Sequence, residues 1–221
     1  MDFEQWSPWY EAIRADFGFD RERDEGSARS LAAMVPPEQL CRPDRLRTKI
    51  RNEVTVCANG PSLDGRLHLI DKRSTIISAG PATTVLYEGG IRPDIFVTDL
   101  DGPIEADLRC NQEGSVAVIH AHGDNLDRLV ELVPRFLGPI VPTTQAAPSP
   151  NIFDFGGFTD GDRAVCLARH FGARKVRLLG FDFDEPRLKP GQDRQVKLRK
   201  LAWARKIIFD LNPPEVELST L

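Results

Sequence analysis

Three aspartates follow two short apolar runs in the middle of the chain. Asp99 and Asp101 come directly after the run at 95–97, and Asp124 comes shortly after the run at 116–119. Apolar runs bounded by turn residues are typical of buried parallel strands. Ligands of open α/β sheets bind outside the carboxyl ends of the strands. We therefore expect the three carboxylates to gather at one edge of one sheet.

Carboxylates gathered in this way repel one another unless a cation lies between them. Asp99 and Asp101 are two residues apart, so they would project to the same side of an extended chain. Mg²⁺ takes one or two carboxylates together with phosphate oxygens, and the D-x-D pair therefore predicts a site for a metal-bound nucleotide. The alternative is that residues 101–103 form only a turn and a helix cap, which would leave Asp99 without a role.

The turn Asn-Gly-Pro-Ser at 59–62 lies between the first predicted strand and the helix after it. Backbone N–H groups at a helix N-terminus bind phosphate, so Asn59, Gly60, Pro61 and Ser62 are candidate nucleotide-binding residues. The stretch matches neither the dinucleotide-binding glycine motif nor a Walker loop, and a plain turn is an equal alternative.

The sequence 120–125, HAHGDN, resembles the start of the H-x-H-x-D-H motif of dinuclear zinc hydrolases. Its last position is Asn125, and only two other histidines occur in the chain. Two zinc ions need more nitrogen ligands than this, which argues against a zinc hydrolase. Asp124 and Asn125 are candidates for binding metal or ribose or for capping the next helix, and His122 for neutralising phosphate charge.

A second cluster, at 155–163, combines two glycines with polar side chains. Glycines allow the backbone to approach a ligand closely, and Arg163 in the first turn of the next helix would reach a phosphate. The threonines and glutamine before this cluster suit an amide-rich heterocycle. The alternative for the cluster is a capped loop, and for Lys197, which would point to the same edge, an exposed lysine. The candidate substrate-binding residues are Thr143, Thr144, Gln145, Gly156, Gly157, Thr159, Asp160 and Asp162.

The elements that must position these residues follow from the hydrophobic pattern. From residue 53 onward, strands alternate with helices, which predicts an α/β fold with a mostly parallel six-stranded sheet and helices on both faces. Residues 216–218 are a candidate edge strand. The six strands are expected near 54–58, 75–78, 95–98, 116–119, 140–143 and 176–179. The helices between and after them are expected near 62–70, 81–88, 103–111, 125–137, 160–171 and 193–211.

Residues 1–50 are predicted to form a helical segment that packs on an α/β catalytic domain of residues 51–221. Aromatic and apolar residues recur at helical spacing between Trp6 and Phe17, and such stripes usually fill cores; a lid over a ligand is the alternative. A polar loop is expected at 20–26, followed by helices at 30–35 and 38–50.

Composition limits the classes of function. The 221 residues suffice for one large α/β domain. The net charge of −4 gives no indication of nucleic-acid binding, and no membrane span or signal peptide is recognisable. The four scattered cysteines lack a C-x-x-C pair, so neither a zinc site nor a disulfide framework is expected and a cytoplasmic location is favoured. Homo-oligomerisation is left open.

Five motifs, taken in order, resemble those of the archaeal 6-hydroxymethyl-7,8-dihydropterin pyrophosphokinase family, and the resemblance covers about residues 50–210. This family is related to the thiamin pyrophosphokinases, whose G-G-x-x-D is similar to residues 156–160. The resemblance implies transfer of the terminal pyrophosphoryl group of ATP to the hydroxymethyl group of the pterin, with release of AMP, in tetrahydromethanopterin or folate synthesis. The motifs are GPSL at 60–63, PDIFVTDLDG at 93–102, HAHGDN at 120–125, TTQ at 143–145 and GGFTDGDRA at 156–164.

The resemblance also implies roles for residues. Asp99, Asp101 and Asp124 would bind Mg²⁺, with Asp160 as a further candidate, and the turn at 60–62 would contact the nucleotide. Residues 143–145 and 160–163 would border the substrates, although Pro142 stands where the family often has glycine. This chemistry needs positioning and cancellation of phosphate charge more than covalent help, and Asp124 or a neighbouring aspartate is the candidate proton acceptor.

Two other functions remain open on the residues alone. A glycosyltransferase would use the D-x-D pair to hold a nucleotide-sugar. A non-catalytic nucleotide-binding module would use the same phosphate-binding turn but would not need three converging carboxylates.

Overall fold

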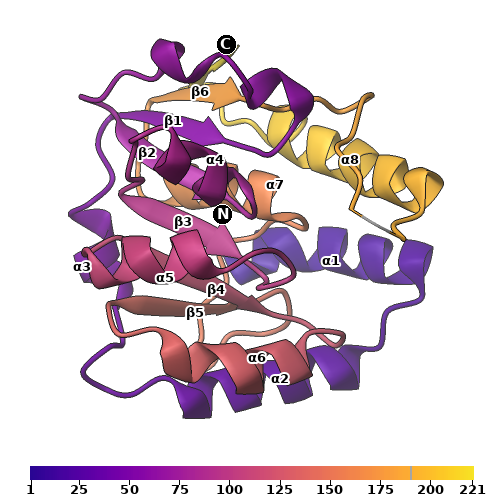
Figure 1. Ribbon diagram of the computed structural model, residues 1–221. Helices are drawn as coiled ribbons and strands as arrows, with labels where there is room; N and C mark the ends of the chain where they lie inside the picture. The colour runs from indigo at the N-terminus through magenta and orange to yellow at the C-terminus, as the bar shows by residue number, and fades with distance from the viewer. Residues whose placement is uncertain (190) are drawn as a thin grey trace.

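The computed structural model describes residues 1–189 and 191–221, which form a layered α/β fold (Figure 1). One parallel sheet carries its strands in the order β5-β4-β3-β2-β1-β6-β7. The strands are β1 (Glu53–Cys57), β2 (Thr75–Ala79), β3 (Ile95–Thr98), β4 (Val116–Ala121), β5 (Ile140–Thr144), β6 (Lys175–Leu179) and β7 (Glu217–Thr220).

The sheet has seven strands, so the prediction of six was wrong. β7 pairs with β6 at the edge of the sheet, and Glu217 lies opposite Lys175. Its residues are exposed or only partly buried, unlike those of the central strands. An edge strand of this kind lacks the continuous apolar run by which the other strands were recognised.

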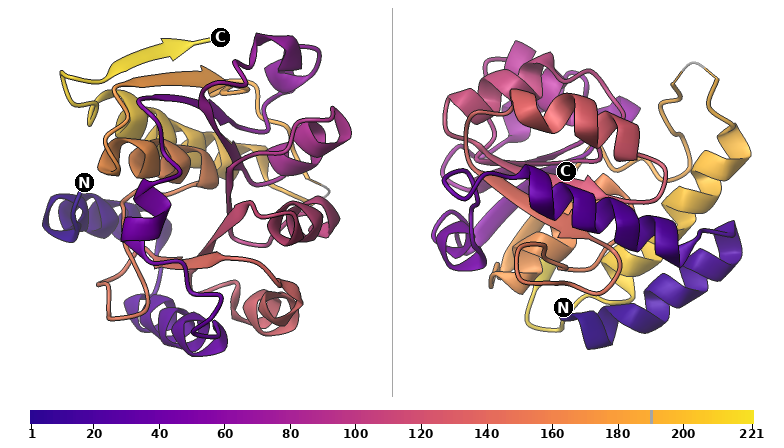
Figure 2. Two further views of the ribbon diagram at one scale, coloured as in Figure 1. Left: turned by 90° about the vertical axis from the view of Figure 1, so that its left-hand side faces the viewer. Right: turned by 90° about the horizontal axis from the view of Figure 1, so that it is seen from below.

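Helices cover both faces of the sheet, as expected (Figure 2). One face carries α4 (Ala82–Glu88), α5 (Glu105–Gln112) and α6 (Leu126–Leu132). The other carries α7 (Asp160–His170), with α8 (Arg194–Phe209) and α1 (Phe3–Phe17) beside it. Helix α2 (Arg21–Met34) contacts β5, β4 and α6 and so covers the β5 edge. The remaining helical turns are α3 (Pro43–Arg47), η1 (Pro61–Leu63), η2 (Leu67–Leu69) and η3 (Val133–Arg135).

Alternation along the strands explains why both faces of the sheet are buried. In β3, Ile95 and Val97 belong to the apolar cluster that includes residues of α7, whereas Phe96 belongs to the cluster that includes residues of α5 and α6. Successive side chains of a strand point to opposite faces. A sheet covered on both faces therefore needs apolar residues at consecutive positions, which is the pattern that predicted these strands.

The polar stretch at 20–26, predicted as a loop, is helical and belongs to α2. The Asp20 side chain caps this helix by accepting a hydrogen bond from the Glu22 backbone N–H at 2.8 Å. Most of the stretch faces solvent and is charged, so it lacks the hydrophobic pattern from which a helix could be predicted. Asp24, Ser27, Ala28 and Leu31 nevertheless form a buried stripe at helical spacing.

Two other helices are shorter than predicted. The stretch at 62–70 forms the single turns η1 and η2 rather than one helix. The stretch at 38–50 is helical only in α3, because the Cys41 backbone N–H bonds to the Ile140 carbonyl and Leu40 forms a bridge with the same residue. Pairing with the sheet thus replaces the expected helix.

The N-terminal residues pack on the rest of the chain. Trp6 is fully buried, and its indole N–H donates to the backbone carbonyl of Gln145 at 3.1 Å. Trp9 meets Trp203 of α8 edge to face, with ring centroids 6.3 Å apart. All four cysteines are free and buried. None of the described helices combines the length and the apolar character that crossing a bilayer requires.

The direction of the connections reverses between β1 and β6. The chain passes from β1 to β5 across one half of the sheet with α4, α5 and α6 on one face, and then returns through α7 on the other face to β6 beside β1. In doubly wound sheets, ligands bind in the crevice at such a switch point, beyond the carboxyl ends of the strands.

Candidate active site

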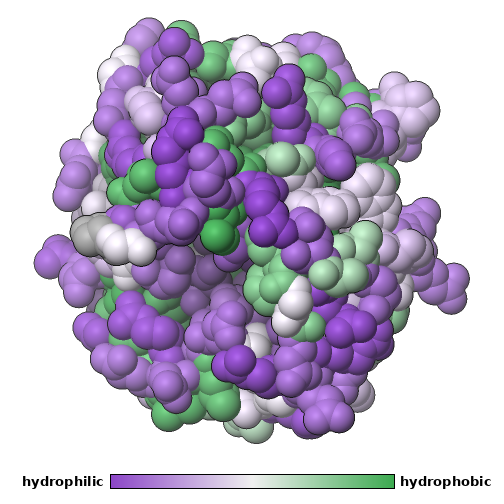
Figure 3. Space-filling model, turned by 90° about the vertical axis from the view of Figure 1, so that its right-hand side faces the viewer, coloured by the Kyte–Doolittle hydropathy of each residue, from purple (hydrophilic) through white to green (hydrophobic). Residues whose placement is uncertain are grey.

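A cavity of about 980 Å³ lies at this switch point. It opens on the face shown in Figure 3, where hydrophobic side chains are visible between strongly hydrophilic ones. Its walls come from the loops that follow β1, β2, β3, β4 and β6, from the start of α7, from α8, and from the connection between α1 and α2. A cavity of this size can hold two small substrates.

The two aspartates after β3 are brought together by a turn. β3 ends at Thr98, and Leu100 has a left-handed backbone with φ 63°. The backbone N–H of Asp101 donates to Asp99 Oδ1 at 3.1 Å. The expected extended chain between the two aspartates is therefore wrong, although both line the cavity. A left-handed conformation is costly for a non-glycine residue and is typical of functional sites.

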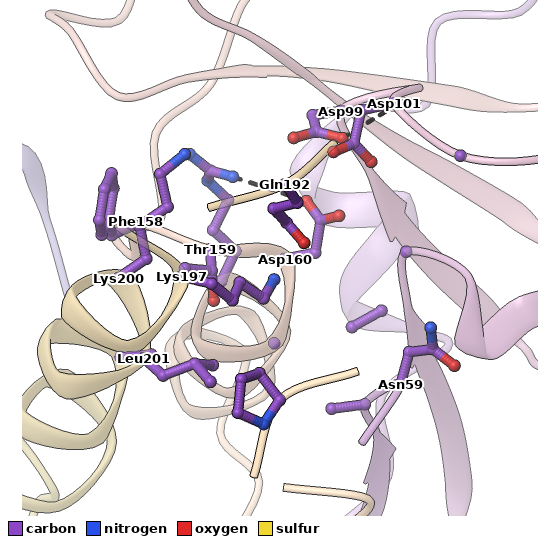
Figure 4. Close-up of a pocket in the computed structure, with 18 of the residues that line it drawn as sticks. Asn59, Asp99, Asp101, Phe158, Thr159, Asp160, Gln192, Lys197, Lys200 and Leu201 are labelled. Atoms are coloured by element: carbon purple, nitrogen blue, oxygen red, sulfur yellow. Dashed lines mark hydrogen bonds and ion pairs between the residues drawn. The ribbon is translucent and has the colours of Figure 1, made fainter. Parts of the chain in front are cut away.

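Asp160 faces the same point from the N-terminus of α7. Thr159 is the N-cap and forms a capping box with Asp162, which places Asp160 at the first helical position. Asp160 Oδ1 is buried, lacks a hydrogen-bond partner and lies 3.5 Å from Nη1 of Arg163. Figure 4 shows Asp160 pointing into the pocket together with Asp99 and Asp101.

The three carboxylates perturb one another. Burial and the Asp99 charge raise the pKa of Asp160 well above its usual value, and they also raise the pKa of Asp101. Burial opposes ionisation of Asp99 as well. Contacts with His122, whose Nε2 lies 3.7 Å from Asp99 Oδ2, and with Asp101, and a smaller effect of the Arg163 charge, together outweigh burial and hold the pKa of Asp99 well below its usual value. Mutually perturbed carboxylates in a cleft are typical of catalytic sites.

Cationic side chains also line the cavity. Lys189 forms an ion pair with Asp101, and Lys197 and Lys200 project from α8 into the pocket (Figure 4). Burial lowers the pKa of Lys200. Arg187 pairs with Asp64 and donates to Asn59 Oδ1 at 3.4 Å. The cavity thus brings carboxylates and ammonium groups together, which suits a phosphorylated ligand with a divalent cation.

These residues fit a divalent cation that protein carboxylates and substrate phosphates would bind together. They do not form a complete metal centre by themselves. Among the described residues, no three His, Cys, Asp or Glu side chains form a cluster that would hold a metal by itself. Asp160 nevertheless has a buried carboxylate oxygen without a partner, and Asp99 and Asp101 repel one another. Mg²⁺ commonly takes one or two carboxylates and fills its remaining positions with water and substrate phosphates.

The turn after β1 is held by the loop after β6. Gly60 N–H donates to the Gly180 carbonyl at 2.9 Å, and Ser62 N–H donates to Asp182 Oδ2 at 2.8 Å. Asn59 and Gly60 line the cavity. Pro61 and Ser62 lie outside its lining, among the residues that the structure describes. Two backbone N–H groups considered for phosphate binding therefore already have acceptors in the protein.

Of the candidate residues after β4, two line the cavity and one is buried behind the lining and holds the loops in place. His122 and Asp124 line the cavity, and Asp124 forms an ion pair at 3.1 Å with Arg23, on the side of the N-terminal segment. Asn125 is buried and donates to the carbonyls of Asp99 and His120 at 2.9 and 2.8 Å. Asn125 thereby ties the loop after β3 to the loop after β4.

Some of the candidate residues after β5 and at the start of α7 also line the cavity, and others are buried outside its lining. Gln145, Thr159, Asp160 and Arg163 line the cavity. The rest are buried or partly buried beside it: Thr143 contacts His120, Thr144 accepts from the Ala146 N–H, and Asp162 caps α7. Gly156 and Gly157 have positive φ and pack closely, Gly156 against Met1 and Gly157 against the Arg163 backbone.

Several lining residues were missed by the sequence analysis: Phe19, Asp24, Asp182, Lys189 and Lys200. Phe17 also lines the cavity, and it belongs to the aromatic stripe for which a lid over a ligand was the alternative. Asp24 is buried and accepts hydrogen bonds from Tyr10, Gln145 and Gly123. The only local signal was the buried stripe of α2, which includes Asp24 and lies in a stretch that reads as polar. Lys189 and Lys200 resemble ordinary surface lysines in the sequence, and only their tertiary position distinguishes them.

The family model and the similar proteins all indicate the same family. Residues 37–187 match the family model described as "6-hydroxymethylpterin diphosphokinase MptE-like". The chain is similar to proteins named 6-hydroxymethyl-7,8-dihydropterin pyrophosphokinase from Methanothermobacter thermautotrophicus, with 41% identity, and Methanocaldococcus jannaschii, with 35%. The first match covers 94% of each chain, and the second covers 94% of this chain and 95% of the relative. A third relative of the same name, from Pyrococcus furiosus, is 38% identical over 94% of this chain and 93% of its own.

One solved structure shares the fold. The MAf glycosyltransferase from Magnetospirillum magneticum AMB-1 superposes with a TM-score of 0.59 over 92% of this chain and 38% of that chain. The two sequences are 19% identical, so this likeness concerns the fold alone. The relation to thiamin pyrophosphokinases stays a prediction from the sequence.

Proposed function

The chain belongs to the MptE-like 6-hydroxymethylpterin diphosphokinase family and is a pyrophosphokinase, and on that premise we propose that it transfers the pyrophosphoryl group of ATP to 6-hydroxymethyl-7,8-dihydropterin. The products are the pterin diphosphate and AMP. The arrangement that carries this proposal is the cavity in which Asp99, Asp101 and Asp160 lie near Lys197, with Lys189 paired to Asp101.

The proposed reaction is a displacement at the β-phosphorus of ATP. The hydroxymethyl oxygen of the pterin bonds to this phosphorus, the bond to the bridging oxygen of AMP breaks, and the hydroxyl proton passes to a carboxylate of the site. Little covalent chemistry is required of the protein, which must align the two substrates and cancel phosphate charge.

In this proposal one or two of the carboxylates of Asp99, Asp101 and Asp160 would hold Mg²⁺ together with the substrate phosphates. When bound, the ion would supply Lewis-acid stabilisation of the phosphate oxygens. Lys189, which pairs with Asp101, and Lys197 bind phosphate oxygens in this proposal. Their positive charges stabilise the negative charge that develops on the departing oxygen of AMP in the transition state.

His122 and Asp124 have supporting roles in the proposal. The contact at 3.7 Å between His122 and Asp99 is one of the interactions that lower the pKa of Asp99 and so favour its ionised form. Asp124, held by Arg23, remains a candidate for the proton acceptor or for an additional metal contact. The support is the placement of both residues in the cavity lining.

An assay of AMP formation tests the proposal. Purified protein is incubated with Mg²⁺ and ATP, with and without 6-hydroxymethyl-7,8-dihydropterin, and AMP and pterin diphosphate are quantified. Equal amounts of the two products, formed only with the pterin present, are expected. Turnover of UDP- or CMP-sugars instead would indicate a glycosyltransferase, and nucleotide binding without turnover would indicate a binding module; either result would overturn the proposal.

A further inference from the structure

The cavity has a charged centre between two ends of different character. In Figure 4, Asp160 lies between Phe158 and Lys200 on one side and Asn59 on the other. The Asn59 end is completed by the loop after β6, which is joined to the turn after β1. The Phe158 end is completed by residues of the N-terminal segment. Two heterocyclic substrates whose reacting groups meet at the carboxylates would occupy one end each.

Asp24 is a buried carboxylate at the Phe158 end. Its side chain is part of the cavity lining, yet the residue is only 2% exposed. It accepts hydrogen bonds from the Tyr10 hydroxyl at 2.8 Å, the Gly123 N–H at 2.7 Å and Gln145 Nε2 at 2.8 Å. These three donors, from separate elements, hold the carboxylate in one orientation. Burial and the bond to Asp24 raise the pKa of Tyr10, so the phenol remains a donor.

The charge of Asp24 has no cationic partner in the part of the chain that the structure describes. The neighbouring Arg23 forms its ion pair with Asp124 instead. Burying a carboxylate without a counter-ion is costly, even when it accepts hydrogen bonds. A carboxylate has room for about four hydrogen bonds, so Asp24 can accept a further one from a ligand in the cavity.

Gln145 and Arg163 lie beside Asp24, and together these side chains could recognise a heterocycle that has donors and an acceptor along one edge. Gln145 Oε1 accepts from Arg163 Nη2 at 3.3 Å, and Arg163 Nε is buried without a partner. The side chains thus present an acceptor, Asp24, and a donor, Arg163. A 2-amino-4-oxopyrimidine edge, as in a pterin, carries the matching ring N–H and amino donors beside a carbonyl acceptor. Adenine instead presents an unprotonated ring nitrogen beside its amino group, which a carboxylate would repel.

An aromatic wall lies at the same end. The ring of Phe158 is 5.3 Å from that of Phe17 and 6.1 Å from that of Phe19, between centroids. The Lys200 ammonium group lies 5.8 Å from the Phe158 ring centroid and 6.0 Å from that of Phe19. Flat ring systems bind well to walls of this kind, through stacking and cation–π contacts.

We propose that this end of the cavity is the pterin subsite and that Asp24 is its specificity-determining residue, with adenosine at the Asn59 end. The inference rests on the proposed function. It assigns to the N-terminal segment a direct part in recognising the acceptor, because Phe17, Phe19 and Asp24 all belong to that segment.

Asp24→Asn tests the assignment when its effects on the two substrates are measured separately. Binding of 6-hydroxymethylpterin is followed by its fluorescence, and binding of a non-hydrolysable ATP analogue by calorimetry. The pterin Kd is expected to rise on the order of 10- to 100-fold, which is typical for loss of a hydrogen bond to a charged group. The Kd of the ATP analogue is expected to change less than about threefold, because that ligand does not contact Asp24 in this proposal.

Glu25→Gln is the matched control, since it removes the same charge from the next residue of α2, which is not part of the cavity lining; it should alter neither Kd. Phe19→Ala provides a second test if Asp24→Asn does not fold, because Phe19 is only partly buried and lies between helices. It too should weaken pterin binding alone. A folded variant of either kind with weakened nucleotide binding and unchanged pterin binding would overturn the assignment.

AMP formation by the wild-type protein, compared with the ligand affinities of the variants, distinguishes failure of this inference from failure of the proposed function. If it forms AMP with the pterin but the variants lose nucleotide affinity, the subsite assignment fails and the proposed reaction stands. If it forms no AMP but loses pterin affinity on Asp24→Asn, the reaction fails and the subsite stands.

Discussion

Asp182 Oδ2 accepts a hydrogen bond from the backbone N–H of Ser62 at 2.8 Å. This bond joins the loop after β6 to the turn after β1, the two strands between which the direction of the connections reverses. In a doubly wound sheet, ligands bind in the crevice at this point. The contact between the two loops forms one side of the cavity, so the shape of the Asn59 end depends on their close packing.

Gly60→Ala should disrupt this packing. A Cβ atom at position 60 would overlap the Asp182 carboxylate and the Gly180 carbonyl, so the two loops would have to separate. We expect a loss of about 1–3 kcal/mol in unfolding free energy, as is typical of overpacking. We also expect a higher KM for ATP and a smaller change for the pterin. Urea unfolding and steady-state kinetics measure the two effects.

Gly65→Ala distinguishes overlap from backbone strain. Gly65 has φ 76°, and a Cβ atom added there would meet no other atom within 4 Å. Its substitution should therefore cost only the conformational penalty of about 1–2 kcal/mol and leave both KM values unchanged. If Gly60→Ala had no greater effect on the ATP KM than Gly65→Ala, the proposed link between the loop contact and nucleotide binding would be wrong.

The central sheet could be predicted because its signals are local. The runs at 95–97 and 116–119 are apolar at consecutive positions, and they lie in the strands β3 and β4, which have partners on both sides. β7 is exposed or only partly buried at the edge, and the first turn of α2 is exposed and rich in charge. Neither carries a strong hydrophobic pattern, and for this reason the strand count and the loop at 20–26 were wrong.

The candidate site could be predicted only in part, for a related reason. Asp99, Asp101 and Asp160 stand at strand or helix ends, where position in a parallel sheet follows from the sequence pattern. The left-handed Leu100 that brings Asp99 and Asp101 together leaves no signal in residue type. Asp24 and Lys189 reach the cavity only through the packing of distant segments, so a single sequence gives no reason to prefer them over other charged residues.

Gly26→Ala should stabilise the protein. Gly26 lies inside α2, and the nearest atom to an added Cβ is the Arg29 guanidinium at 3.9 Å, an ordinary contact distance. Alanine should raise the unfolding free energy by about 0.5–1 kcal/mol, because glycine loses more backbone entropy in a helix. The midpoint of urea unfolding measures the change. A lower midpoint would show that residues 20–26 are not helical in solution.

Asp101→Asn should lower turnover far more than stability. The Asp101 side chain is 51% exposed and its ion pair with Lys189 lies in the open cavity within reach of solvent, so the unfolding free energy should change by less than about 1 kcal/mol. We expect kcat to fall by about 100-fold or more, as for loss of other electrostatic groups at reacting centres, and the Mg²⁺ concentration for half-maximal rate to rise.

The exposed Asp127, in the first turn of α6, provides the matched control, because Asp127→Asn removes a charge outside the cavity lining. This variant should retain the wild-type rate and Mg²⁺ dependence. Unchanged turnover in Asp101→Asn would remove Asp101 from the site.

Asp160→Asn should show opposite effects on stability and activity. Burial and the Asp99 charge raise the pKa of Asp160, so its ionised form is unfavourable in the absence of a cation. At pH 8 without divalent ions, the amide should raise the unfolding free energy, while turnover with Mg²⁺ falls. Thermal unfolding with and without Mg²⁺ measures the first effect. A variant that is both less stable and fully active would contradict the role of Asp160 as a strained ligand.

The pH dependence of stability should be carried partly by Asp107, in α5 and outside the cavity lining. Burial, with a smaller contribution from the Glu105 charge, raises the pKa of Asp107 to about 7, against a smaller lowering by Thr83. Because Asp107 ionises near pH 4 in the unfolded chain, only the unfolded state releases this proton between about pH 4 and 7. Stability should therefore fall as the pH rises through this window.

Asp107→Asn removes this ionisation and should raise the unfolding free energy at pH 8 by about 2–4 kcal/mol, with little effect at pH 4. Urea unfolding of both proteins at pH 4, 5, 6, 7 and 8 gives the two curves. A slope should persist in the variant, because burial also raises the pKa of Asp154 to about 7. Glu105→Gln, at an exposed position of the same helix, should leave most of the slope in place. Parallel curves for the wild type and Asp107→Asn would show that Asp107 is ionised in the folded protein throughout this range.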